Sequence, residues 1–192
     1  MTNLNLLQFL DRVSTPANLL IEPAPNDEQL AQIFKAAMNA PDHRHLRPYR
    51  FITIRGEARQ ALSEVFVNAV KIRKPDVDDD YLNKQRQKPL RSPLIVVLVA
   101  CLQDDPKVPE IEQILCTGAV ANNMMLASNA LGFGSIWLTG GNAFDDNVCK
   151  PLGLADSEKI IGFIYLGTPK VKMPDRGMHD LSGKVTDWVK PL

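Results

Sequence analysis

The sequence predicts a single α+β domain in which helices pack on a mixed or antiparallel central sheet. Two runs rich in β-branched residues, at 94–100 and 160–166, are typical of strands buried on both faces. Between them, a long segment from Ile111 is apolar on more than one side, which indicates a buried helix. A chain of 192 residues is long enough for one large hydrophobic core. Because no repeat or linker interrupts it, we expect residues 1–192 to form one domain with a polar tail at 170–192.

The composition narrows the class of protein. Lys plus Arg and Asp plus Glu both number 22, so no excess of charge points to a nucleic-acid or membrane partner. No apolar run reaches the roughly 18 residues needed to span a bilayer. The N-terminus lacks the basic start and the long apolar core of a secretion signal. Three cysteines, in apolar or helical segments, suit a reducing compartment, so we expect a cytoplasmic protein.

The elements are predicted from hydrophobic periodicity and from the residues that begin and end them. Pro16 cannot continue a helix, Asn26 is a good N-cap, and Gln29 three residues later completes a capping-box pattern. The expected order is a helix at 3–11, an extended segment at 19–25, a helix at 26–40, a loop at 42–49, a strand at 51–54, a helix at 57–72, a charged helix within 74–91 that is exposed or partly mobile, a strand at 94–100, a helix from 111, a strand from 134, a short helix at 143–150, and a strand at 160–166 that the run at 167–169 ends.

The segment 111–141 is the expected centre of both the core and the site. Its helix carries many small residues, which let another backbone approach closely, although Gly118 lowers the helix propensity by about 1 kcal/mol. Gly132 stands where a left-handed C-cap is expected, and a strand follows it at once. We therefore expect a closely packed neighbour against this helix.

Three familiar functional motifs do not fit the sequence. The Gly-Phe-Gly run at 132–134 follows a helix and precedes a strand, whereas a dinucleotide-binding loop has the reverse order, and Trp137 occupies the place of its third glycine. His43 and His45 have one further histidine and no CxxC pair to complete a zinc site, so no metal is expected. Cys116 lies among apolar neighbours on a buried helix, where a thiol is usually inert packing rather than a nucleophile.

Three groups of polar residues could bind a ligand, although each has a structural explanation as well. The first combines a guanidinium with a hydroxyl, which suits a phosphate, but a solvated helix end would also account for it. The second borders a loop made rigid by two prolines and the third ends a strand, so surface polarity and core packing are the alternatives. The groups are Arg12 with Ser14, Asn39 with His43 and Arg47, and Trp137 with Leu138 and Thr139.

Several short motifs occur in a definite order along the chain. The most specific are Ala-Pro-Asp-His at 40–43 and Gly-Phe-Gly-x-Ile-Trp at 132–137. The others are Arg-Val-Ser at 12–14, Glu-Pro-Ala-Pro at 22–25, Arg-Pro-Tyr at 47–49 and Ile-Gly-Phe-Ile-Tyr-Leu-Gly-Thr-Pro at 161–169. In this order they resemble the nitroreductase family of FMN proteins, in particular its compact branch, and the resemblance covers nearly the whole chain.

The resemblance implies an obligate homodimer with two FMN sites at the subunit interface. One chain would supply Arg12, Val13 and Ser14 to the FMN phosphate and ribityl group. The same chain would supply Trp137, Leu138 and Thr139 as a wall of the flavin. Asn39 and His43, with Arg47 nearby, would reach the same flavin from the other chain.

The sequence departs from the family pattern around the phosphate. Val13 stands where the family has a second arginine, and Asn39 replaces a further arginine. Leu138 and Thr139 replace an Arg-Ser pair. With fewer cations, the site would bind FMN more loosely or recruit another basic side chain. Arg47 replaces a glutamine, and we expect it near the pyrimidine edge, where it would stabilise the reduced, anionic flavin.

The function implied is that of an FMN-dependent NAD(P)H oxidoreductase working by ping-pong transfer. Reduced nicotinamide would give hydride to flavin N5 and leave, and a nitroaromatic, quinone or similar small molecule would take the electrons. The cofactor carries this chemistry, so no side chain is assigned as a general acid or base. Two alternatives remain open: a flavin-binding or flavin-handling protein of the same fold without nicotinamide turnover, and a non-enzymatic α+β interaction domain.

Overall fold

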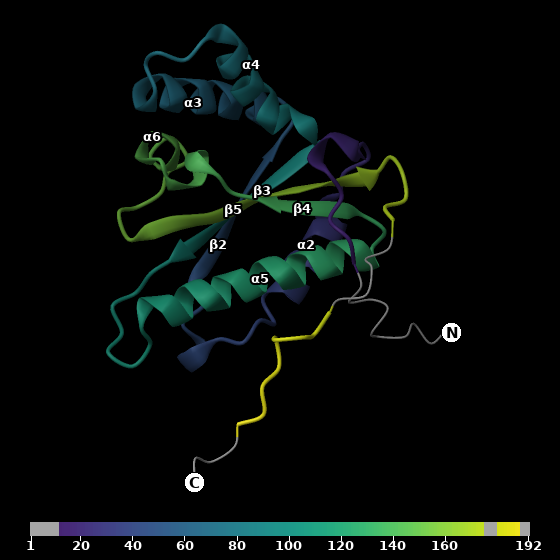
Figure 1. Cartoon of the computed structure of the whole chain (residues 1–192), viewed down its shortest axis with the longest axis vertical. Coiled ribbons are helices and arrows are strands. Elements are labelled where there is room, and N and C mark those ends of the chain that lie inside the picture. Colours follow the sequence, from purple (N-terminus) through teal and green to yellow (C-terminus); the bar gives the residue numbers. More distant parts are fainter. Residues whose placement is uncertain (1–11, 175–179, 189–192) are drawn as a thin grey trace.

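The computed structural model describes residues 12–174 and 180–188, so the helix predicted at 3–11 lies outside the described residues. A five-stranded sheet lies between two layers of helices, with α3, α4 and α6 on one face and α2 and α5 on the other (Figure 1). In chain order the elements are η1 (Ala17–Leu19), β1 (Leu20–Ile21), α2 (Asp27–Ala37), η2 (His43–His45), β2 (Tyr49–Arg55), α3 (Ala58–Arg73), α4 (Asp79–Gln87), η3 (Lys88–Arg91), β3 (Leu94–Cys101), α5 (Glu110–Ala130), β4 (Gly134–Leu138), η4 (Gly141–Phe144), α6 (Asp146–Cys149) and β5 (Glu158–Pro169).

Every strand pairing among the described residues is antiparallel. β3 lies between β2 and β5, and β5 also pairs with β4 and β1. The register places Phe51 of β2 opposite Leu98 of β3, and Val96 of β3 opposite Ile164 of β5. A β-bulge shifts the β3–β5 register between Leu98 and Val99. The predicted α+β fold with a mixed or antiparallel sheet is confirmed, and the sheet is antiparallel.

Alternation along β3 divides the core into two layers. Successive side chains of a strand point to opposite faces, so one set packs towards α3 and the other towards α2 and α5. The first set is Ile95, Val97 and Val99, and the second is Leu94, Val96 and Leu98. All of these side chains are fully buried, which is why the sequence of β3 reads as a continuous apolar run.

The helix ends form as the sequence predicts. The Asn26 side chain accepts a hydrogen bond from the Gln29 N–H at 2.9 Å, and the Gln29 side chain accepts one from the Asn26 N–H at 3.0 Å, so the capping box is complete. Gly132 follows the end of α5 with a φ of 84°, the left-handed conformation expected of a C-cap glycine. Neither α5 nor any other helix of the described residues is long and apolar enough to cross a membrane.

The last strand is longer than predicted. The run at 167–169 does not end it, because Thr168 and Pro169 pair with Ile21 and Leu20 of β1. The sequence predicted an extended segment at 19–25 but no strand within it. The two residues of β1 form a strand only through this pairing with a segment far along the chain. The N-terminal part of the described chain is thereby fixed to the end of β5.

Two surface segments also differ from the prediction. The charged segment 74–91 is not simply exposed or mobile, because Leu82 of α4 is buried against Val67 and Val70 of α3. The helix expected at 143–150 is split into η4 and α6. Asp145 separates them, and its side chain accepts a hydrogen bond from the N–H of the second residue of α6, which begins a new helix there.

Candidate functional site

The segment 12–14, expected to contact a phosphate, is held beside β4. Arg12, Val13 and Ser14 are half-buried, and Arg12 Nη1 donates to Ser14 Oγ at the long distance of 3.5 Å. The next residue, Thr15, is buried, and its N–H donates to the Ser135 carbonyl at 3.0 Å. The guanidinium and hydroxyl predicted from the sequence therefore lie together at the side of a core strand.

Gly134 makes this close approach possible. A Cβ at this position would lie 2.7 Å from Thr15 Oγ1, 2.8 Å from Leu20 Cδ2 and 3.0 Å from Pro169 Cγ. All three distances are shorter than van der Waals contacts allow. The second glycine of the Gly-Phe-Gly run is thus needed for packing of the N-terminal segment on β4, rather than for contact with a dinucleotide.

Trp137 and Leu138 at the end of β4 point to opposite faces of the sheet. The Trp137 indole N–H donates to the Ile161 carbonyl at 3.2 Å in the α5 layer. The indole lies over Gly162, where a Cβ would be 1.9 Å from the indole nitrogen. Leu138 packs in the α3 layer, and Thr139 is exposed beyond the strand. Leu138 and Thr139, but not Trp137, therefore line cavities on the α3 side.

Two cavities lie beside the end of β4 on this side. The η3 cavity has a volume of about 320 Å³ and the β4 cavity about 430 Å³, both within the range of small-molecule sites. The η3 cavity is lined by Phe66, Lys88, Arg91, Leu138, Thr139, Gly140, Asn142, Phe163 and Tyr165. The β4 cavity is lined by Pro16, Ala17, Asn18, Arg91, Ile136 and Leu138, so it begins two residues after Ser14.

Lys88 and Arg91, which the sequence did not single out, make the η3 cavity basic. Burial lowers the pKa of Lys88, and the guanidinium groups of Arg91 and Arg73 lower it further. Burial raises the pKa of Tyr165 to about 12, and Arg91 opposes this shift. In the sequence these cations belong to a highly charged segment, which usually covers a solvated face. The one available signal was their place just before a buried strand.

Arg73 fixes the wall of this cavity that η4 provides. Its guanidinium forms an ion pair with Asp145 and donates to Asn142 Oδ1 at 3.2 Å and to the Gly141 carbonyl at 3.4 Å. Asn142 and Asp145 are both buried. The end of α3 and the η4 turn are therefore joined, and the position of the Asn142 amide in the cavity wall is set by these bonds.

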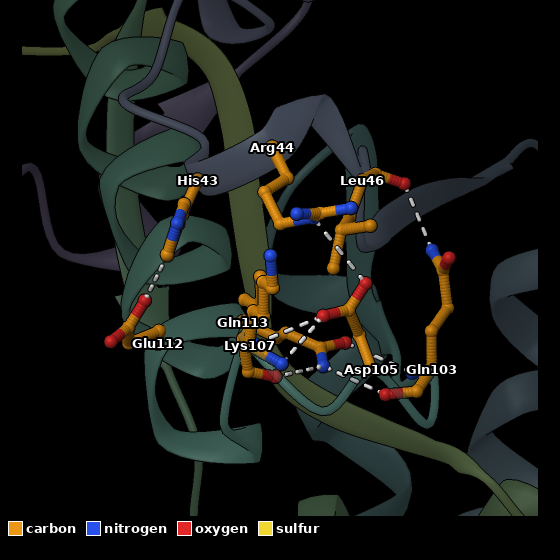
Figure 2. A network of polar contacts seen from close by, with 9 residues as sticks. His43, Arg44, Leu46, Gln103, Asp105, Lys107, Glu112 and Gln113 are labelled. Atoms are coloured by element: carbon orange, nitrogen blue, oxygen red, sulfur yellow. Dashed lines mark hydrogen bonds and ion pairs between the residues drawn. The ribbon is translucent and has the colours of Figure 1, made fainter.

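The second predicted group lies elsewhere, on or beside the loop that precedes β2. His43 Nδ1 is 2.7 Å from Glu112 Oε2 in the first turn of α5, as Figure 2 shows. Asn39 is exposed, and its Nδ2 donates to the Lys35 carbonyl at 3.3 Å. Neither Asn39 nor His43 hydrogen-bonds to β4 within the described residues. Within a single chain, therefore, no direct hydrogen bond of the described residues connects Asn39 or His43 to the residues of β4.

The loop around His43 holds an unusual backbone conformation. Arg44, His45 and Arg47 have positive φ values of 61°, 55° and 49°, a region that residues other than glycine seldom adopt. The Arg47 N–H donates to Asp42 Oδ2 at 2.8 Å, which supports the turn from within. Strain of this kind persists only where surrounding contacts hold it, and it is frequent at functional sites.

Contacts with the segment before α5 supply that support (Figure 2). Arg44 Nε lies 3.6 Å from Asp105 Oδ2, and Gln103 Nε2 donates to the Leu46 carbonyl at 2.8 Å. Buried Gln113 in turn holds Gln103, accepting from its N–H at 2.9 Å and donating to its carbonyl at 2.8 Å. The loop is therefore fixed to α5 both directly and through this segment.

The thiol of Cys116 has the properties of a packing residue. It is buried on α5, and burial together with the nearby Asp42 carboxylate raises its pKa to about 11. It is therefore protonated, and a poor nucleophile, at neutral pH. Among residues 12–174 and 180–188, no three His, Cys, Asp or Glu side chains are placed to hold a metal ion.

Two large apolar side chains near the start of α5 are exposed. Ile111 and Leu115 lie one helical turn apart and are 58% and 64% exposed. Further along, an apolar groove of about 470 Å³ lies between α2 and α5. Its lining residues are Gln32, Ala36, Asn123, Leu126, Ala127, Ala130 and Leu131. Exposed apolar side chains and an apolar groove on one helix commonly mark a site of protein association.

Sequence comparison finds close counterparts among known proteins. The family model described as the nitroreductase family matches residues 12–168. YdjA of Escherichia coli (strain K12), provisionally named an NAD(P)H nitroreductase, is 40% identical over 156 residues, which make up 81% of this chain and 84% of YdjA. A protein of Haemophilus influenzae with the same provisional name is 35% identical over 152 residues, or 78% of this chain and 80% of that protein.

Solved structures share the fold over almost their whole length. The nitroreductase-like family protein from Bacillus cereus superposes with a TM-score of 0.81 at 19% identity, covering 97% of both chains. A nitroreductase with bound FMN from Bacteroides fragilis superposes with a TM-score of 0.70 at 20% identity, covering 95% of this chain and 98% of that one. At these identities the structures establish a common fold.

Proposed function

The chain belongs to the nitroreductase family, and from this premise we propose that it is an FMN-dependent NAD(P)H oxidoreductase. Its acceptors are nitroaromatic, quinone or similar small molecules, reduced in a ping-pong cycle. FMN, when bound, supplies the redox chemistry by accepting hydride at N5 and passing electrons to the acceptor. The side chains of the protein bind and orient the reactants, and none is assigned as a general acid or base.

The observation that carries this proposal is the position of segment 12–14 along β4. The Arg12 guanidinium and the Ser14 hydroxyl are half-buried donors of the kind that hold a phosphate ester. Leu138 ends β4 and Thr139 follows it, and the β4 cavity opens between Leu138 and the residues after Ser14. The donor set and the adjoining space therefore fit FMN. Val13 adds the remaining backbone of the phosphate-binding segment, and Trp137 holds the end of β4 in place.

A second copy of the chain completes the proposed site. The exposed apolar surface of α5 and the groove between α2 and α5 provide the surface for a homodimer. Asn39 lies just after the end of α2, and His43 lies beside the start of α5, so both are near elements that border this surface. From the second copy they would reach the flavin held by Arg12 and Ser14 of the first, with Arg47 near its pyrimidine edge.

The visible absorption spectrum of the purified protein tests the proposal, before and after FMN is added and unbound flavin is washed away. A yellow protein with about one flavin per chain, bleached by NADH or NADPH without oxygen, is the expected result. Retained flavin that neither nucleotide bleaches would instead indicate a flavin-binding protein without nicotinamide turnover. A colourless protein that does not retain FMN would contradict the proposal and favour a non-enzymatic domain.

A further inference from the structure

The loop that carries His43 is fixed to α5 at three points. His43 Nδ1 lies 2.7 Å from Glu112 Oε2 (Figure 2). At the other end of the loop, the buried hydroxyl of Thr117 donates to the Pro48 carbonyl at 3.1 Å. Between these points, buried Gln113 reaches the loop through the hydrogen-bonded bridge described above. Because all three anchors lie within residues 112–117, the loop and the first half of α5 form one connected unit.

These anchors hold a backbone conformation that would otherwise relax. The residues that follow His43 have positive φ values at Arg44, His45 and Arg47. Residues other than glycine keep such conformations only where the surrounding structure holds them. If the anchors were removed, the loop would relax and the His43 imidazole would move with it. The three contacts with α5 therefore determine where this imidazole lies.

The contact with Glu112 also determines which nitrogen of the His43 ring carries the proton. A carboxylate can only accept a hydrogen bond, so His43 Nδ1 donates to Glu112. Across the described part of the chain, His43 Nε2 makes no hydrogen bond. In the neutral ring Nε2 is therefore an acceptor, because the proton is on the other nitrogen. Without Glu112 the proton could lie on either nitrogen, and Nε2 would lose this defined role.

Exposure and a comparison within α5 set this pair apart from an ordinary surface ion pair, which contributes little to stability. The His43 side chain is 53% exposed, so its free nitrogen is accessible to a second molecule. Glu110, in the same turn of α5, forms an ion pair with Lys159 of β5 and does not contact the loop. Glu112 is thus the acidic residue of this turn that acts on the strained loop.

We propose that Glu112 is a positioning residue of the flavin site. It orients His43 and keeps the proton on Nδ1, so that Nε2 is the atom presented to the FMN held by the second copy of the chain. The inference rests on the proposed function, in which His43 reaches the flavin of the other copy. While the ring is neutral, Nε2 accepts a hydrogen bond from an N–H or O–H group of FMN. Glu112 acts only through His43 and does not contact the flavin.

The first experiment determines the tautomer of His43 in the protein without flavin. Nitrogen-15 NMR distinguishes a protonated ring nitrogen from an unprotonated one, at a pH where the imidazole is neutral, and the His43→Ala variant identifies the signals. Glu112→Ala removes the acceptor, whereas Glu112→Gln keeps an acceptor oxygen without its charge. Glu110→Ala removes a carboxylate from the same turn of α5 and is the matched control.

The wild type and Glu110→Ala should both carry the His43 proton on Nδ1. Glu112→Ala should shift the proton towards Nε2, and Glu112→Gln should lie between the two, because its amide oxygen can still accept from Nδ1. A wild-type ring with its proton on Nε2, or a tautomer that Glu112→Ala leaves unchanged, would overturn the inference.

A double-mutant cycle then tests whether Glu112 acts through His43. The affinity for FMN is measured by fluorescence titration for the wild type, Glu112→Ala, His43→Ala and the double variant. Glu112→Ala should weaken FMN binding by about 2- to 10-fold, the equivalent of one hydrogen bond, and should have no effect in the His43→Ala background. Equal losses in both backgrounds would show that Glu112 supports the loop as a whole, and this result, like the absence of any loss, would contradict the positioning role.

The two experiments separate failure of this inference from failure of the proposed function. If the wild-type protein binds no FMN, the flavin function is wrong, and the tautomer measurement alone decides whether Glu112 orients His43. If FMN binds but the cycle shows no coupling between the two residues, the flavin function stands and the positioning role is wrong.

Discussion

Replacing Gly162 by alanine should be strongly destabilising, because the indole of Trp137 occupies the space of a Cβ. The added carbon would lie 1.9 Å from the indole nitrogen and 2.4 Å from Cδ1. Moving the nitrogen from 1.9 Å to the ordinary contact of 3.4 Å requires a retreat of about 1.5 Å. This would break the 3.2 Å hydrogen bond to the Ile161 carbonyl. Overpacking and the lost bond together should cost about 2–4 kcal/mol.

A double-mutant cycle isolates this contact. Trp137→Leu removes the indole, so Gly162→Ala in that background should cost under about 1 kcal/mol. The free energies of unfolding of the four proteins are measured by denaturant titration at one protein concentration, because the stability of the proposed dimer would depend on concentration. The φ of Gly162 lies outside the positive range, so alanine brings no backbone strain to obscure the result. Equal costs of Gly162→Ala in both backgrounds would refute the steric reasoning.

Four further outcomes follow from contacts in the structure. Gly134→Ala should displace the segment 12–14, lowering the free energy of unfolding by about 1–3 kcal/mol. It should also weaken FMN binding in a fluorescence titration. An unaltered FMN affinity would count against the assignment of Arg12 and Ser14 to the FMN phosphate. Hydrogen bonds from Arg50 lower the pKa of Glu158 from 4.5 to about 2, so their stabilisation is present above about pH 4.5 and lost as the pH falls towards 2. Glu158→Gln should therefore flatten the loss of stability followed by circular dichroism over that range, and a curve as steep as the wild type's would contradict this. Asn26→Ala should reduce the free energy of unfolding by about 1 kcal/mol through loss of the capping box, with Asn26→Ser as the near-neutral control. Arg47→Gln should lower the flavin midpoint potential, and an unchanged potential would rule out its place beside the pyrimidine edge.

Local signals in the sequence were sufficient where an element depends on its own residues. β3 is buried on both faces, so both faces must be apolar, and its sequence is apolar throughout. Asn26 and Gln29 hydrogen-bond to each other's backbone N–H groups, so four consecutive residues are enough to specify the start of α2. The end of α5 at Gly132 is likewise a local feature.

The sequence prediction failed where structure depends on distant partners. β1 is a strand because its two residues pair with Thr168 and Pro169 at the end of β5. Neither segment alone has a sequence pattern that predicts a strand there. Lys88 and Arg91 resemble any solvated charge until α3, β4 and β5 close a cavity around them. Arg12 and Ser14 were predicted from their chemistry and from family resemblance. Their position beside β4 depends on Gly134, whose packing role no local pattern indicates.

The position of β5 at the end of the chain has a consequence during protein synthesis. β3 has its β2 partner as soon as it is made, but its other edge and much of its core surface await β5. The ribosome must add the 57 residues that separate Cys101 from Glu158, which takes about 3 to 11 s at 5–20 residues per second. For that interval the nascent chain presents an open strand edge flanked by apolar side chains, the kind of surface that aggregates or is bound by chaperones. Truncation anywhere before β5 should therefore yield chains that chaperones retain, because the strand that closes the sheet is the last to emerge.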